Sequence, residues 1–227
     1  MIAVLSGPDT KISIENPSLS NILFDLQFDT IYHEHYSYLS AYSVAKLSNM
    51  SGLSLFNVEQ LKVHGGSNRY WLKKLASDSI IEPSVGNLVK IENECGLFNP
   101  KEWASFSGKV SGILTNFLQW LRLGEENNLR IYGYGAAAKA STILNSIDAT
   151  PNLVKAIADL SLEKQGRFMP SHGISIISPQ ELFIEEPTDI VIFPWNIESE
   201  IAAFLRANLG DEVRMWCAVP DLHRIEI

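Results

Sequence analysis

The stretch Leu129–Ile147, LRIYGYGAAAKASTILNSI, decides how the C-terminal part of this chain folds. A short apolar run leads into the pattern G-x-G-x-x-A at Gly133–Ala138, and an alanine-rich segment of helical character follows. Glycines in such a turn let the backbone approach a phosphate, and the start of the next helix offers free N–H groups. Lys139 adds a positive charge there. The stretch predicts a strand, a turn and a helix that hold a nucleotide or dinucleotide; the alternative is a turn of small residues that serves packing only.

Strands and helices alternate after this turn. Apolar runs at 153–160, 188–195 and 212–219 predict three further strands, the last of which should end the sheet, and 198–210 predicts a helix. This alternation favours an α/β fold with a parallel sheet. Asp159 ends the second strand, where a dinucleotide-binding fold places its ribose-binding acid. Pro194, Trp195 and Asn196 lie at the C-terminal end of the third, at the edge where open parallel sheets bind ligands.

The N-terminal part predicts a smaller unit. A strand is expected at 11–17, a helix at 40–52, and two strands at 53–61 and 67–75 that KVHGG joins as a hairpin. The pattern from 83 to 127 is helical. We therefore expect three parts: a first unit over 1–80, a helical connection over 81–127, and a Rossmann-like domain over 128–227.

Composition limits the function. The chain has 227 residues, 46% of them apolar and 19% charged, as in an ordinary globular protein. Its net charge of −8 argues against non-specific nucleic-acid binding, and no apolar run is long enough to span a membrane. Two cysteines, Cys95 and Cys217, make neither a disulfide framework nor a thiolate zinc site. A cytoplasmic location is expected.

The densest polar and aromatic stretch is Phe28–Tyr36, FDTIYHEHY. In an extended segment His33 and His35 point to one side and Glu34 to the other. A histidine can accept a proton near neutral pH, and a neighbouring carboxylate can orient it. The alternatives are a metal site built on H-x-H, for which no further ligand is evident, and a hydrogen-bonded surface loop.

Five segments in this order resemble one known family. They are FDTIYHEHYSYLS at 28–40, VHGGSNRYWL at 63–72, YGYGAAAKASTILN at 132–145, EKQGRFMP at 163–170 and FPWNIESEI at 193–201. Together they resemble the sugar C-methyltransferases of deoxysugar biosynthesis, which use S-adenosylmethionine and act on nucleotide-linked keto-sugars.

The resemblance, which runs from about Lys11 to the end, implies a larger architecture. It comprises a zinc-binding region, a central methyltransferase domain and a C-terminal Rossmann-like domain that helps to hold the sugar nucleotide. The chain then corresponds to the closing elements of the central sheet and all that follows. We expect the methyl-donor half to be missing, so that this chain alone binds no S-adenosylmethionine and has doubtful activity. A separate donor-binding subunit or a homodimer is the expected partner.

The implied reaction methylates a carbon next to a sugar ketone, which needs a base for the α-proton and a donor for the enolate oxygen. The resemblance implies that His35 is the base, that Glu34 orients it or contacts the sugar, and that Tyr32 is a second acid/base or the enolate donor; His33 is a further candidate. The implied substrate contacts are His64, Gly65, Gly66, Ser67 and Arg69 for the sugar, Gly133, Gly135, Ala136 and Lys139 for the diphosphate, and Lys164, Gln165 and Asn196 as outer contacts.

Two other functions compete. An NAD-dependent oxidoreductase would explain the glycine turn and Asp159, but it leaves the Tyr-His-Glu-His segment without a role. A non-catalytic module that binds nucleotide sugars would retain the binding residues and not need His35.

Overall fold

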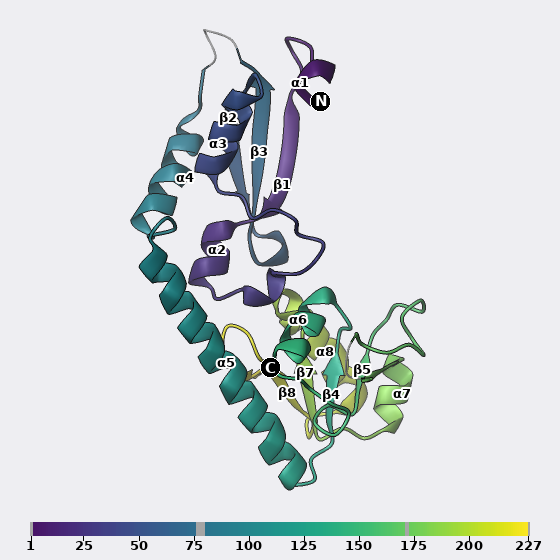
Figure 1. Cartoon of the computed structure of the whole chain (residues 1–227). Helices are drawn as coiled ribbons and strands as arrows, with labels where there is room; N and C mark the ends of the chain where they lie inside the picture. Colours follow the sequence, from purple (N-terminus) through teal and green to yellow (C-terminus); the bar gives the residue numbers. More distant parts are fainter. Residues whose placement is uncertain (1, 76–79, 171–172, 227) are drawn as a thin grey trace. The chain divides into compact units, whose positions relative to one another are not determined.

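The computed structural model describes residues 2–75, 80–170 and 173–226, which form two compact units (Figure 1). The first unit comprises Met1–Leu26 and Glu34–Phe106, and the second comprises Gln27–His33 and Ser107–Ile227. The units divide inside the long helix α5 (Pro100–Glu126), within the expected helical connection. The short segment Gln27–His33 belongs to the second unit, although the chain on both sides of it belongs to the first.

The first unit contains a three-stranded sheet in the order β1-β3-β2. The strands are β1 (Ile12–Pro17), β2 (Leu53–Leu61) and β3 (Ser67–Lys74), and β3 runs antiparallel to both neighbours. The turn η2 (Val63–Gly65) joins β2 to β3, which confirms the predicted hairpin. The remaining helices of this unit are α1 (Ile2–Leu5), α2 (Leu19–Phe24), α3 (Ala41–Met50) and α4 (Pro83–Glu94).

Two polar residues fix the start of α3. Ser40 caps the helix by accepting a hydrogen bond from the Ser43 N–H at 3.1 Å, and the Ser43 hydroxyl accepts one from the Ser40 N–H at 3.0 Å. The buried carboxylate of Glu92 on α4 accepts a further bond from the Ala41 N–H at 2.6 Å. The free N–H groups at this helix end are therefore satisfied inside the unit, where Val44, Leu55 and Leu88 contribute to the core.

The second unit contains a six-stranded sheet in the order β6-β5-β4-β7-β8-β9. The first five strands in this order are mutually parallel, and β9 is antiparallel to β8. This arrangement confirms the predicted Rossmann-like α/β domain. Its elements are η1 (Phe28–Thr30), β4 (Ile131–Tyr134), α6 (Ala138–Ser146), β5 (Ala156–Ala158), β6 (Ser175–Ile177), α7 (Pro179–Ile184), β7 (Asp189–Ile192), η3 (Trp195–Ile197), α8 (Glu198–Leu209), β8 (Arg214–Cys217) and β9 (His223–Arg224).

The prediction that 212–219 ends the sheet was wrong, because β9 follows and pairs with β8. A strand of two residues has too little apolar periodicity to be recognised in the sequence. Neither β6 nor α7 was predicted. α7 carries a clear capping box, in which Ser178 and Glu181 bond reciprocally, and this pattern could have identified it.

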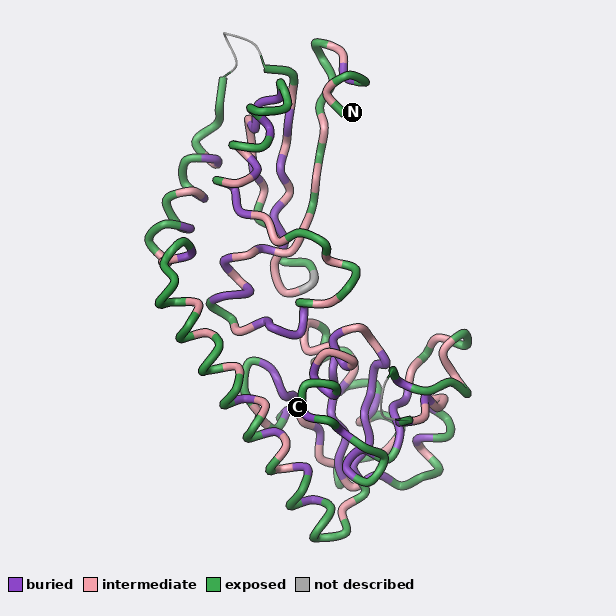
Figure 2. Tube along the Cα trace, viewed as in Figure 1, coloured by how far each residue is buried: buried purple, intermediate pink, exposed green. Residues whose placement is uncertain are grey.

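The core of the second unit lies on its central strands, which Figure 2 draws as buried. All residues of β4 and β7 are buried. From α5, Ile113, Phe117 and Leu121 are buried, and the Trp120 ring lies 5.0 Å from that of Trp216. The loops at the carboxyl edge of the sheet therefore extend from a buried core. In the part of the chain that the structure describes, no helix has the length and apolar character needed to cross a membrane.

Candidate functional site at the carboxyl edge of the parallel sheet

A cavity of about 380 Å³ opens at the carboxyl edge of the six-stranded sheet. Open parallel sheets bind ligands at this edge because the loops that follow neighbouring strands meet there. The lining comes from the ends of β4, β5 and β7 and from the start of α8; it includes Tyr134, Gly135, Asp159, Pro194 and Ile197. The predicted glycine turn and the predicted Pro-Trp-Asn element therefore meet at one place.

Both glycines of the turn have a packing reason to be glycine. A Cβ on Gly133 would lie 2.8 Å from side-chain atoms of Ile157 on β5 and of Phe193, which directly follows β7. Gly135 has a φ of +88°, and a Cβ there would lie 2.4 Å from the Pro194 ring. Tight packing thus accounts for the glycines without a ligand, and their contact with a diphosphate remains a prediction.

The Asp159 carboxylate, which follows β5, binds to the backbone of the glycine turn. Its Oδ2 accepts hydrogen bonds from the Ala136 N–H at 2.8 Å and from the Lys164 ammonium at 3.1 Å. Lys164 also donates to the Ala136 carbonyl at 2.9 Å, and Gln165 donates to the Asp159 carbonyl at 2.9 Å. An N–H group that a phosphate could use is therefore taken by a carboxylate of the chain itself. Asp159 is committed to the turn, which weakens its assignment as a ribose-binding acid.

Lys139, Asn196 and Trp195 form a cluster of polar contacts that also includes Asp29, which is distant in the sequence. The Lys139 ammonium donates to Asn196 Oδ1 at 3.1 Å and lies 3.8 Å from the centroid of the Trp195 ring. The Trp195 indole N–H donates to Asp29 Oδ2 at 2.7 Å. Asp29 is fully buried, and its Oδ1 makes no hydrogen bond in the described part of the chain. This cluster fastens the segment Phe28–Thr30 to the loop that follows β7.

Burial shifts both charges of the cluster toward their neutral forms. Burial raises the pKa of Asp29, and the charge of Lys139 and the hydrogen bond from Trp195 oppose this shift. Burial lowers the pKa of Lys139, and the charge of Asp29 opposes the shift. The charge of each group is thus the largest influence that opposes the pKa shift of the other. Lys139 is 9% exposed, so its first role is to hold this cluster together.

The Tyr-His-Glu-His segment spans the division between the two units. Tyr32 and His33 belong to the second unit, whereas Glu34 and His35 belong to the first. Tyr32 and His35 are half-buried, and His33 and Glu34 are exposed. The His35 ring packs edge-on against Tyr38 with 6.3 Å between centroids.

The predicted sugar contacts follow the turn between β2 and β3 in the first unit. Gly66 has a φ of +111°, its carbonyl accepts from the Ser18 N–H at 3.0 Å, and Gly65 accepts from the Asn21 amide at 3.4 Å. Ser67 is buried. Arg69 pairs with Glu15 at 2.9 Å and Glu59 at 3.4 Å on the neighbouring strands. The side chain of His64 lies outside the described residues.

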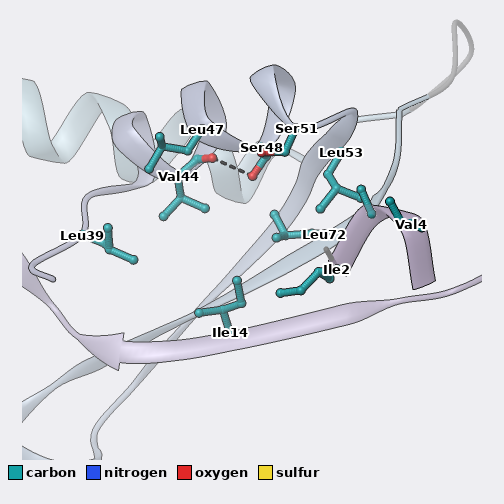
Figure 3. Close-up of a pocket in the computed structure, with 11 residues that line it drawn as sticks. Ile2, Val4, Ile14, Leu39, Val44, Leu47, Ser48, Ser51, Leu53 and Leu72 are labelled. Atoms are coloured by element: carbon teal, nitrogen blue, oxygen red, sulfur yellow. Dashed lines mark hydrogen bonds between the residues drawn. The ribbon is translucent and has the colours of Figure 1, made fainter. Parts of the chain in front are cut away.

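A second, apolar cavity of about 640 Å³ lies in the first unit (Figure 3). Its walls come from β1, β3, α3 and α1, with Ile14, Val44, Leu47 and Leu72 among the lining residues. The Ser48 hydroxyl on this wall donates to the Val44 carbonyl at 2.6 Å, so it offers little to a polar ligand. Beside the cavity, β1 is an edge strand of its sheet, and among the described residues β3 is its one neighbour there. Apolar walls next to an open strand edge are typical of a surface that another protein element covers.

Comparison with known proteins identifies the family. Residues 62–220 match the model of the C-methyltransferase C-terminal domain, which is more than half of the chain. The chain belongs to this C-methyltransferase family. The C-methyltransferase NovU of Streptomyces niveus is 28% identical over 220 residues, which cover 97% of this chain and 52% of NovU. The chain therefore spans about half the length of this curated relative.

The family match covers part of the predicted site. The matched range includes the β2–β3 turn, the glycine turn and the Trp195 loop, whereas Tyr32–His35 precede it. The predicted roles of these four residues therefore remain predictions.

Asp29 lies within FDTIYHEHY, and no role was predicted for it. A carboxylate among aromatic residues just before the Tyr-His-Glu-His segment was the available signal. Its partner Trp195 is 166 positions away, so only the fold could reveal the contact.

Proposed function

We propose that this C-methyltransferase chain binds a nucleotide-linked keto-sugar and removes the proton from the carbon next to its ketone. The observation that carries the proposal is the 2.7 Å hydrogen bond between Trp195 and Asp29. It fastens Phe28–Thr30, which lies just before the Tyr-His-Glu-His segment, to the edge of the sheet where a nucleotide would bind. A substrate that is held by its diphosphate at this edge would bring its sugar toward Tyr32, which lies in the same unit.

The diphosphate site of this proposal is built around Lys164. Its side chain is 43% exposed, whereas that of its partner Asp159 is 12% exposed. The ammonium can keep its bond to Asp159 and still donate outward, because it carries three hydrogens. Gln165 and the backbone of the glycine turn lie beside the Lys164 ammonium. The two phosphates of the substrate are negatively charged, and a local cation attracts them despite the net charge of −8 on the chain.

In the proposed reaction His35 accepts the α-proton, Glu34 orients it, and Tyr32 donates a hydrogen bond to the enolate oxygen. Each role suits the side chain, because imidazole accepts a proton near neutral pH and a phenol hydroxyl donates one hydrogen bond. A positioned base contributes typically 10²–10⁴-fold to such a step, so about 3–5 kcal/mol of the barrier is assigned to His35.

S-adenosylmethionine would supply the methyl group in the complete enzyme. The two cavities described above do not suit it: the apolar one has two serines in its lining, and in the one at the sheet edge Asp159 is already committed to the turn. We therefore assign donor binding to a further methyl-donor-binding α/β domain, which we place on the open edge of β1 and the adjoining apolar cavity. The greater length of NovU, of which this chain matches about half, supports this occupant.

Solvent-exchange NMR tests proton abstraction without the methyl donor. The chain is incubated in deuterium oxide with a thymidine-diphosphate-linked keto-sugar, and loss of the proton next to the ketone is followed. We expect exchange in the wild-type chain, and a loss of at least 100-fold in His35→Asn. Tyr36→Phe is the matched control, since Tyr36 is 94% exposed and should retain full exchange. Equal rates in His35→Asn and the wild type would refute the assigned base.

Calorimetric titration separates the competing functions. Thymidine diphosphate should bind, and Lys164→Met should weaken it at least tenfold. Lys155→Met is the control, because Lys155 precedes β5 at the opposite end of the strand. Binding of NADH without thymidine diphosphate would instead favour an oxidoreductase. Binding of thymidine diphosphate with no proton exchange would favour a non-catalytic module.

Light scattering tests whether the open edge of β1 and the adjoining apolar cavity bind the donor-binding domain. The chain is mixed with the part of NovU that it does not match, and a one-to-one complex is expected. Leu47→Glu, which places a charge in the apolar cavity, should abolish it, whereas Lys46→Glu on the same helix should not. A homodimer that Leu47→Glu dissociates would assign the surface to a second copy of the chain.

A further inference from the structure

Three potential metal-ligand side chains meet where β8 ends, outside the site described at the carboxyl edge of the sheet. Glu198 begins α8, Cys217 ends β8, and His223 begins β9. One ligand atom from each residue lies within 4.8 Å of the other two. Cys217 is buried, and the other two residues are half-buried. A thiol, an imidazole and a carboxylate are the side chains that zinc sites use.

The backbone holds two of the three residues in register. Cys217 and His223 are opposite each other in the antiparallel pair of β8 and β9. Residues opposite each other in such a pair project their side chains to the same face of the sheet. The third residue stands at the first position of α8. Each ligand atom thus comes from a regular element and not from a free loop.

A hydrogen bond orients the imidazole. His223 Nδ1 lies 2.9 Å from the Asp221 carbonyl oxygen, which can only accept, so Nδ1 carries the hydrogen. In the neutral ring the lone pair is then on Nε2, which lies on the side of Glu198. Histidines that bind metals commonly donate their other N–H to a carbonyl or a carboxylate in this way.

The separation of the ligand atoms fits a shared cation. His223 Nε2 and Glu198 Oε2 are 3.6 Å apart, which is too long for a hydrogen bond. Two ligands at about 2.0–2.2 Å from one tetrahedral zinc ion are roughly 3.3–3.6 Å apart. An imidazole lone pair and a carboxylate that face each other repel, and a cation between them turns this repulsion into attraction.

We propose that Glu198, Cys217 and His223 bind one zinc ion. A mixed sulfur, nitrogen and oxygen set favours zinc over magnesium or calcium, which take oxygen ligands. The side chains of His223 and Glu198 are 36% and 31% exposed, so water can occupy the fourth position. The ion would fasten β9 and the start of α8 to the end of β8. The alternative is a protonated His223 that pairs directly with Glu198.

Cobalt titration tests the site. The full chain, free of tags and dialysed against a chelator, is titrated with Co²⁺, whose bond to a thiolate gives an ultraviolet charge-transfer band. We expect one equivalent to produce the band and Zn²⁺ to abolish it by displacement. Cys217→Ser should remove the band, whereas Cys95→Ser, which changes the other cysteine, should retain it. His223→Gln should weaken binding at least tenfold.

Each result of the cobalt titration either supports or overturns the zinc site. No band at saturating Co²⁺, or a band that persists in Cys217→Ser, would overturn the proposal. Equal affinity in His223→Gln would overturn it as well and leave the ion pair of His223 with Glu198. The melting temperature gives a second readout, since an ion that binds only the folded state raises it. That rise should appear for the wild type and Cys95→Ser, and should vanish in Cys217→Ser, with circular dichroism confirming that each variant is folded.

Discussion

Replacement of Trp195 by phenylalanine should loosen the attachment of the Phe28–Thr30 segment to the sheet. The change removes the indole N–H that donates to Asp29 at 2.7 Å and keeps an aromatic ring beside the Lys139 ammonium. A hydrogen bond to a charged group contributes about 1.5–3 kcal/mol, and a fully buried carboxylate that loses its donor has no water to replace it. We expect the local opening free energy of this segment to fall by about 2 kcal/mol.

Amide hydrogen exchange measures this loss where it occurs. The Thr30 and Ile31 N–H groups donate to the Gln27 and Phe28 carbonyls at 3.1 and 3.0 Å, so they exchange when the segment opens. A loss of about 2 kcal/mol corresponds to roughly 30-fold faster exchange. Trp103→Phe is the matched control. Trp103 donates to the Leu97 carbonyl at 2.8 Å in the first unit, so its replacement should leave these two amides unchanged.

A double-mutant cycle with Asp29→Asn isolates the pair. In the Asp29→Asn background Trp195→Phe removes a neutral hydrogen bond of about 1 kcal/mol, so the coupling should be about 1 kcal/mol. Additive effects within about 0.3 kcal/mol, or less than threefold faster exchange in Trp195→Phe, would refute the reasoning.

Three further predictions concern stability, measured by denaturant unfolding. Burial raises the pKa of the Glu92 carboxyl, so folding favours its protonated form. The contribution of this group to the free energy of unfolding is fully present below pH 4.5, its ordinary pKa, and is lost as the pH rises through the raised pKa. Glu92→Gln should remove this dependence of stability on pH. Gly135→Ala should cost about 1–3 kcal/mol, because φ is +88° and the new Cβ meets a proline ring at 2.4 Å; Gly108→Ala, in open space on α5, should be neutral or stabilising. Asp189→Ala should cost about 3 kcal/mol because it leaves Arg214, 2.7 Å away, without its carboxylate, and Asp189→Asn should cost less; equal costs would contradict the role of the charge.

Local signals in the sequence located most elements. The alternation of apolar and polar residues at 11–17 and 53–61 predicted strands, and the structure confirms them as β1 and β2. The helix expected at 40–52 is α3 in the structure. The residues that make up such a signal lie close together in the sequence, so the signal can be recognised without knowledge of the tertiary contacts. β9 and α2 are short, and their positions depend on contacts with distant segments.

The sequence by itself determined the α/β class, the glycine turn and the resemblance to C-methyltransferases, because each rests on residues that are close in sequence or on their order. Only the tertiary structure decided which partners the polar side chains take. It committed Asp159 to the Ala136 N–H and Lys164, and it joined Asp29 to Trp195. It also gathered Glu198, Cys217 and His223 at the end of β8. The physical reason is that a buried charge must find its partner wherever the fold brings one within about 3 Å, and sequence distance does not limit that choice.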